Sequence, residues 1–231
     1  MIAVAVAAGG QAVTAIGFSL IAVPFVTVAI GAAAAVPTVN LLAGGLNIVM
    51  LNHERRDVRW RDALNLFIPA AIVIPFVAIA IRHLSGDALS IIAGVMIVAS
   101  CAILASGLRA PSLAGRRGAV VAGALSGAGN VATGVGGPFA AMYAINADWP
   151  AKAYRPTMQA YFLGINIVSV TSRGLPSADR PGLLTAMVVS GGVGWAIGRR
   201  VAASVDHELV RNLTLVVATA GGIVAIVRGI V

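Results

Sequence analysis

The sequence has little charge, few aromatic residues and a single cysteine. Charged side chains make up 10% of the 231 residues and aromatic side chains 5%, whereas 59% of the residues are apolar. A soluble domain usually carries about one quarter charged residues, so this composition excludes an ordinary soluble domain. One cysteine, Cys101, excludes both a disulfide framework and a cysteine metal cluster within the chain.

Asp, Glu, Lys and Arg are also absent from the middle of every predicted membrane segment. This absence argues against the carboxylate proton relay that many transporters use. The three histidines, His53, His83 and His207, fall in or beside loops and have no acidic or cysteine cluster at ligand spacing, so neither a metal site nor a cofactor is predicted. A serine nucleophile needs a neighbouring base, and no histidine lies at the predicted membrane depth of Ser126, which argues against an intramembrane serine protease. We therefore expect that the chain is not an enzyme.

Long apolar runs are abundant, and the mean hydropathy of the chain is +0.95. A helix of about 20 apolar residues crosses about 30 Å of hydrocarbon. We therefore expect an all-α polytopic membrane protein in the lipid bilayer, with about eight transmembrane helices. The predicted segments are residues 2–31, 33–51, 63–81, 88–107, 118–146, 151–171, 182–202 and 208–229.

Two of these segments are rich in glycine and are expected to be broken or re-entrant helices. Backbone freed by such breaks is tolerated at membrane depth only where protein or a water-filled cavity satisfies it, so both segments should face the interior. The interrupting residues are Gly9, Gly10, Gly17 and Pro24 in the first segment, and the run from Gly134 to Pro138 in the second.

An internal repeat relates the two halves. The stretch Thr14–Val49 recurs as Thr133–Val168 at a constant offset of 119 residues. The ungapped match includes two Pro-Thr pairs and two Gly-x-Asn-Ile-Val runs, which indicates a duplication. We therefore divide the chain into a first transmembrane repeat, residues 1–110, and a second, residues 111–231, with a linker at 108–117.

The sixteen Lys and Arg residues lie almost wholly between or at the ends of apolar segments, so the net charge of +8 indicates membrane orientation rather than nucleic-acid binding. With eight crossings, ten of them fall on the side of the termini and six on the other side, which favours cytoplasmic termini. If a Gly-rich segment re-enters instead of crossing, this count changes and the halves become inverted rather than parallel. Residues 1–10 lack a basic stretch, so the first helix is expected to be retained.

Four amide side chains repeat on two predicted helices. Asn40 and Asn47 are seven residues apart and share a helix face, and Gln159 and Asn166 reproduce this arrangement. Amides are costly in hydrocarbon without partners, so both faces should point into the protein. Two readings remain open: these amides hold helices together, or they contact a substrate.

The two helix breaks supply the other candidate groups. Exposed backbone N–H groups at a helix start, together with the positive end of the helix dipole, form an anion site. The predicted substrate-binding residues are therefore Thr14, Gly17, Asn40, Asn47, Thr133, Gly134, Gly136, Gly137, Gln159 and Asn166.

Four short stretches carry a family resemblance. They are Ala15-Ile16-Gly17-Phe18-Ser19 leading to Pro24, Gly134-Val135-Gly136-Gly137-Pro138, Pro37-Thr38-Val39-Asn40, and the loop Val58-Arg59-Trp60-Arg61. In these stretches the chain resembles the TauE/SafE sulfite exporter family, in which each half begins with a G-x-G-G-G segment, an apolar run and a proline, followed by a helix that carries an Asn. The resemblance covers essentially the whole chain.

This resemblance implies a multi-pass transporter of a bacterial cell (inner) membrane that passes a small sulfur-containing anion. Two departures bear on the substrate: the first repeat keeps only one motif glycine, and Tyr143 stands where the first repeat has Pro24. Our hypothesis is an exporter of sulfite or organosulfonates. An uptake permease or channel for another small solute, and a non-transporting membrane scaffold, stay as alternatives, and so does assembly into a homo-oligomer.

Overall fold

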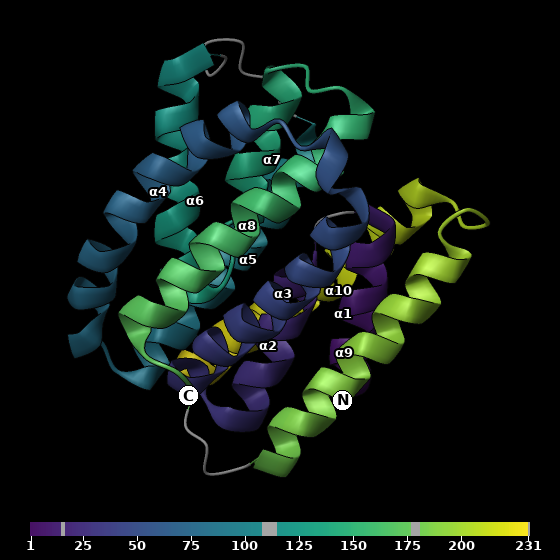
Figure 1. The fold of residues 1–231 in the computed structure, drawn as a ribbon. Helices are drawn as coiled ribbons and strands as arrows, with labels where there is room; N and C mark the ends of the chain where they lie inside the picture. Colours follow the sequence, from purple (N-terminus) through teal and green to yellow (C-terminus); the bar gives the residue numbers. More distant parts are fainter. Residues whose placement is uncertain (15–16, 108–114, 177–180, 231) are drawn as a thin grey trace.

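The computed structural model describes residues 1–14, 17–107, 115–176 and 181–230, and it is helical almost throughout that part of the chain (Figure 1). The α-helices are α1 (Ile2–Thr14), α2 (Phe18–Ile30), α3 (Ala32–Glu54), α4 (Trp60–Ala80), α5 (Gly86–Ser106), α6 (Gly115–Thr133), α7 (Gly137–Asn146), α8 (Ala151–Arg173), α9 (Pro181–Val201) and α10 (His207–Ile230). Two 3-10 turns, Arg55–Asp57 and Ile81–His83, follow α3 and α4. The all-α prediction is confirmed for the described residues.

Both Gly-rich segments are broken once, at a single point. The first break separates α1 from α2, and the second separates α6 from α7. Gly9, Gly10 and Pro24, which we expected to interrupt the first segment, lie inside helices. Pro138 falls in the first turn of α7, where its missing N–H has no intrahelical partner to lose. Residues 15–16 of the first motif and 108–114 of the linker lie outside the described residues.

Close backbone contacts hold the second break in place. Gly134 has a φ of +75°, which L side chains rarely adopt, and a Cβ there would lie 2.8 Å from Val23 Cγ2. A Cβ at Gly136 would collide with the backbone oxygen of Ser126. The Ser126 hydroxyl donates a hydrogen bond of 2.7 Å to the Gly136 oxygen, so α6 is tied to the start of α7.

Helices α3 and α8 lie side by side at the centre and run antiparallel (Figure 1). Arg155 at the start of α8 lies 3.7 Å from Glu54 at the end of α3, and Arg173 at the end of α8 donates to the Ala33 oxygen at the start of α3. Helices α5 and α10 are also antiparallel, since a Cβ at Gly94 would touch the Gly222 oxygen and a Cβ at Gly229 would touch the Asp87 oxygen.

Two parallel pairs flank the centre, α1 with α9 and α6 with α4. In the first pair, added Cβ atoms at Gly194 and Gly198 would meet the backbone of Ala5 and Gly9. Helices in lipid gain no hydrophobic free energy by associating. Small residues let their backbones approach closely, and the resulting van der Waals contacts stabilise the pair instead. The equivalent helices of the two halves therefore take equivalent partners.

The outer faces of the bundle are apolar. Helix α4, for example, exposes Ile68, Ile72, Phe76 and Ile79, each more than half accessible. Among the described residues, five helices are long and apolar enough to cross a membrane, namely α3, α4, α5, α9 and α10. The predicted eight spans are not confirmed, because α1, α2 and α7 are short and α8 carries polar side chains on its buried face.

Basic side chains gather at one end of the bundle. We call this the basic end; α3 ends there, and α4, α6, α8 and α10 begin there. Both chain termini lie at the opposite end (Figure 1). In the described part of the chain the basic end holds eleven Lys or Arg residues, Arg55, Arg56, Arg59, Arg61, Arg116, Arg117, Lys152, Arg155, Arg199, Arg200 and Arg211, against three at the opposite end, Arg82, Arg173 and Arg228.

Candidate functional site

A network of buried amides lies where the two helix breaks approach α3 and α8. It includes the four predicted amides and two that the sequence analysis missed, Gln11 on α1 and Asn130 on α6. All six side chains are at most 5% exposed. Buried amide groups normally form hydrogen bonds. The donors and acceptors that these six side chains do not use among themselves therefore decide what the site can bind.

Gln11 connects the first break to both central helices. Its side-chain nitrogen donates to the Asn47 oxygen at 3.2 Å and to the Gln159 oxygen at 3.3 Å. The Met50 sulfur lies 3.8 Å from the same nitrogen as a weak third acceptor. Gln11 thus joins α1 to α3 in its own half and to α8 in the other half.

Asn130 has the same position in the second half. Its nitrogen donates to the Asn166 oxygen at 3.0 Å, and its oxygen accepts from Asn40 at 3.3 Å and from the Ser169 hydroxyl at 2.6 Å. The backbone oxygen of Asn130 also lies within reach of the Asn40 nitrogen, at 3.4 Å.

The two sets of contacts correspond residue by residue. At the offset of 119, Gln11 matches Asn130, Asn40 matches Gln159, Asn47 matches Asn166 and Met50 matches Ser169. Gln11 and Asn130 lie three residues before Thr14 and Thr133, where the predicted repeat begins, and they have the same offset. This shared offset is the sequence signal that identifies both residues.

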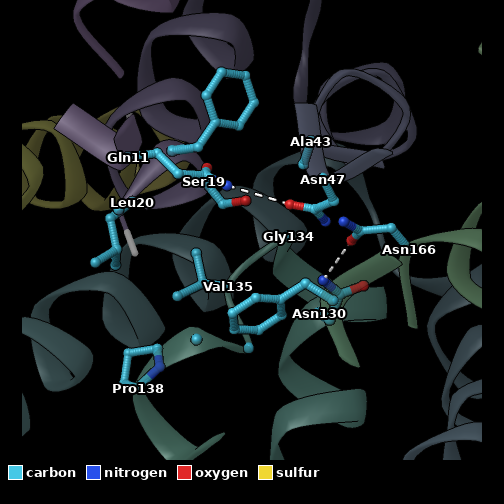
Figure 2. Close-up of a pocket in the computed structure, with 15 residues that line it drawn as sticks. Gln11, Ser19, Leu20, Ala43, Asn47, Asn130, Gly134, Val135, Pro138 and Asn166 are labelled. Carbon is cyan, nitrogen blue, oxygen red and sulfur yellow. Dashed lines mark hydrogen bonds between the residues drawn. The ribbon is translucent and has the colours of Figure 1, made fainter. Parts of the chain in front are cut away.

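A small cavity of about 40 Å³ lies beside this network (Figure 2). One water molecule needs a cavity volume of roughly 10–15 Å³ when the volume is measured in this way, so this cavity has room for a guest of a few atoms. Its lining comes from both breaks and both central helices: Gln11, Gly17, Phe18, Ser19, Leu20, Ala43, Asn47, Asn130, Gly134, Val135, Gly136, Gly137, Pro138, Phe162 and Asn166. The lining contains no charged side chain.

The amide nitrogens of Asn47 and Asn166 turn towards each other beside this cavity (Figure 2). Gln11 and Asn130 each donate to the oxygen of one of these amides, and that orientation leaves the nitrogens for the cavity. The Asn47 nitrogen is buried and has no hydrogen-bond partner among the described residues. Two converging donors require an acceptor between them, such as a water or an anion oxygen.

Two helix starts also border the cavity. Gly17 precedes α2 and Gly136 precedes α7, and neither residue supplies a side-chain hydrogen bond to its helix start. The first N–H groups of a helix lack intrahelical partners and carry roughly half a positive charge. The cavity therefore combines two positive helix ends with amide donors.

The opposite, negative helix ends at the breaks are capped by two arginines of α8. The Arg155 guanidinium donates to the Ala12 oxygen near the end of α1. The Arg173 guanidinium donates to the Val131 and Ala132 oxygens near the end of α6, at 2.9 and 3.3 Å. Since a cation at a helix C-terminus offsets the dipole there, the negative ends are neutralised while the positive ends stay directed at the cavity.

The structure brings six of the ten predicted site residues to the cavity wall: Gly17, Asn47, Gly134, Gly136, Gly137 and Asn166. Asn40 and Gln159 lie behind the wall in the amide network. The hydroxyls of Thr14 and Thr133 donate to carbonyl oxygens of their own helices, at 2.9 and 2.8 Å, and line no part of this cavity.

Comparison with known protein families gives a match over nearly the whole chain. Residues 1–225 match the family described as Sulfite exporter TauE/SafE. No curated protein and no solved structure matches the chain. The family match covers both helix breaks, both central helices and the cavity between them.

Proposed function

The chain belongs to the sulfite exporter TauE/SafE family, and from this premise we propose that it exports small sulfur-containing oxyanions, such as sulfite or organosulfonates, across a cell membrane. The family is one of membrane transporters, in agreement with the membrane-capable helices. The observation that carries the anion proposal is the convergence of the Asn47 and Asn166 amide nitrogens on a cavity that also receives two uncapped helix starts.

A site without charged side chains suits transport. Roughly half a positive charge at each helix start attracts an anion, and N–H donors can replace part of its hydration shell. A buried Lys or Arg would bind the anion more tightly and slow its release. In our assignment Asn47 and Asn166 contact the substrate directly, together with the backbone at Gly17, Gly134, Gly136 and Gly137. Asn40 and Gln159 hold these groups in place.

The arrangement of the halves supports an inverted repeat. The bounds of α3 and α8, Ala32–Glu54 and Ala151–Arg173, differ by the same offset of 119, yet these helices run antiparallel. Each broken pair, α1–α2 and α6–α7, therefore enters the bundle from a different end. We propose six crossing helices, α3, α4, α5, α8, α9 and α10, with two oppositely directed helical hairpins that meet at the cavity, as in inverted-repeat transporters.

The inverted arrangement reverses the expected orientation. The earlier expectation of cytoplasmic termini assumed that each Gly-rich segment crosses once. With hairpins instead, the described Lys and Arg residues divide eleven to three in favour of the basic end. Cytoplasmic loops carry the excess of basic residues, so we propose that the basic end faces the cytoplasm and both termini face outward.

Export in this orientation needs no coupling ion. A membrane that is negative inside favours outward movement of a monoanion by about 2.3 kcal/mol per 100 mV. Import against that potential would require a driving ion, and no carboxylate lines the cavity to bind one. We therefore expect flux to follow the membrane potential.

The test is sulfite efflux from liposomes that contain the purified protein, under an imposed potential. Asn47→Asp places a carboxylate beside the anion, and Coulomb repulsion of about 3 kcal/mol at a separation of ~5 Å and an effective dielectric of ~20 predicts a loss of at least about tenfold in flux. Asn52→Asp is the matched control, because Asn52 lies exposed on the same helix.

Three outcomes separate the alternatives. Outward sulfite flux that depends on potential and is lost in Asn47→Asp, but kept in Asn52→Asp, supports the proposal. Flux only into the compartment of negative potential points to an uptake system. A wild-type protein that is folded but moves no sulfite, sulfonate or sulfate contradicts the transporter proposal and favours a scaffold.

A further inference from the structure

A second polar cavity lies between the amide network and the basic end. Its volume is about 90 Å³, and it is lined by Ala12, Met50, His53, Glu54, Arg155, Trp195 and Arg199. Four of its seven lining residues carry ionisable side chains, whereas the central cavity has none. We call it the arginine cavity.

Cations outnumber anions in the arginine cavity. Arg199 stacks over the Trp195 ring at 5.4 Å from its centroid, and His53 contacts the same ring at 5.8 Å between centroids. Arg155 adds a second guanidinium, and Glu54 is the single carboxylate in the lining. The cavity therefore carries a net positive charge.

The polar groups of Arg155 and Glu54 are incompletely satisfied. Glu54 Oε1 lies 3.7 Å from an Arg155 terminal nitrogen, a distance of ion pairing rather than of a direct hydrogen bond. Arg155 Nε and Glu54 Oε2 are both buried and have no hydrogen-bond partner among the described residues. A buried guanidinium N–H without a partner can donate a hydrogen bond to an anion.

One side-chain contact links the two cavities. Met50 lines the arginine cavity, and its sulfur accepts from Gln11, which lines the central cavity. Gln11 also donates to Asn47 in the wall of the central cavity, so this one side chain bridges lining residues of both cavities. The arginine cavity therefore adjoins the central cavity on the side of the basic end.

We propose that the arginine cavity is an entry site for small anions, where Arg155 and Arg199 collect the anion before it passes Gln11 to the central site. This inference rests on the proposed function for the fate of the anion, but not for its binding. Glu54 is a competitor: its carboxylate takes the place that the anion occupies beside Arg155. Removing an arginine and removing this carboxylate should therefore change anion binding in opposite directions.

Trp195 is a built-in reporter for this test. Replacing the other two tryptophans, Trp60 and Trp149, by phenylalanine leaves Trp195 as the only tryptophan in the full chain. Iodide, a small anion, quenches tryptophan fluorescence by contact, and acrylamide does the same without charge. The ratio of the two quenching constants measures how strongly the cavity concentrates anions.

In this background Arg199→Gln should lower the iodide-to-acrylamide ratio, and Glu54→Gln should raise it, each by about two- to fivefold for a partly exposed charge. The matched control is Arg200→Gln, because the adjacent Arg200 is exposed and does not line the cavity. A ratio that is equal in Arg199→Gln, Glu54→Gln and the parent chain would overturn the entry site, whether or not the protein transports sulfite.

Transport measurements then separate the entry site from the proposed function. If the wild-type protein exports sulfite, Arg199→Gln should reduce efflux at low sulfite more than at saturating sulfite. Equal loss at both concentrations would contradict a collecting role. If the wild-type protein moves no anion but the quenching ratios shift as expected, the proposed function fails and the anion site stands.

Discussion

Removal of the Asn130 side chain tests how much the buried amide network stabilises the fold. Asn130 contacts three polar side chains, Asn40, Asn166 and Ser169, at 3.3, 3.0 and 2.6 Å. Asn130→Ala deletes all three hydrogen bonds at once. It leaves the Asn166 oxygen and the Ser169 hydroxyl buried without these partners.

The expected loss of stability can be estimated from these contacts. Polar contacts between membrane helices contribute about 0.6 kcal/mol on average and up to about 1.7, so three of them amount to about 2–5 kcal/mol. Alanine is a better helix former than asparagine by roughly 0.6 kcal/mol, which offsets part of the loss. The network term is larger, and we expect a net destabilisation of about 1–4 kcal/mol.

The assay is reversible unfolding in mixed micelles, with the free energy of unfolding compared between the wild-type protein and Asn130→Ala. Ser90→Ala serves as the control, because Ser90 is half-buried and, among the described residues, its hydroxyl donates only to the Gly86 oxygen of its own helix. We expect the control to stay within about 0.5 kcal/mol of the wild type.

The reasoning is refuted if Asn130→Ala unfolds at the wild-type free energy. Such a result would mean that the partners of Asn130 find other acceptors or water at no cost. A loss equal to that of Ser90→Ala would also show that the network does not stabilise the fold. In either case the hydrogen bonds of Asn130 would make no measurable contribution to the free energy of unfolding.

Two further predictions concern packing and substrate contact. Gly194→Ala should destabilise the fold by about 1–3 kcal/mol in the same unfolding assay, because the added Cβ meets the Ala5 backbone, whereas Gly192→Ala, with nothing within 4 Å, should be neutral or slightly stabilising. Gln159→Ala and Asn166→Ala should reduce sulfite flux per folded protein more than they reduce stability. Collapse of stability with normal residual flux would instead identify these two amides as interhelical contacts only.

Much of the fold follows from local sequence. Apolar runs of membrane length, bounded by Arg-rich turns, predict most helices within a few residues, because each run must satisfy its backbone internally in lipid. The break from Gly134 to Pro138 was also predictable, since three glycines and a proline within five residues oppose a continuous helix. The number of spans was not predictable in this way. A Gly-rich segment that turns back has nearly the same composition as one that crosses.

The candidate site was predictable only in part. Asn47 and Asn166 stand out as amides in apolar helices, and the structure brings both to one cavity. Thr14 and Thr133 stand out equally, yet their hydroxyls bond to their own helices. Helical serine and threonine hydroxyls have a backbone acceptor four residues away, so sequence alone does not tell whether they face a ligand.

The sequence by itself determined that this is a helical membrane protein, and it predicted two related halves with neutral, amide-bearing segments in each. These properties depend on composition and on an offset that is visible along the chain. Only the tertiary structure decided that α3 and α8 run antiparallel, that Gln11 and Asn130 each join both halves, and that the amide nitrogens of Asn47 and Asn166 face one cavity. Those features depend on contacts between residues 90 or more positions apart, and helix periodicity does not reach that far.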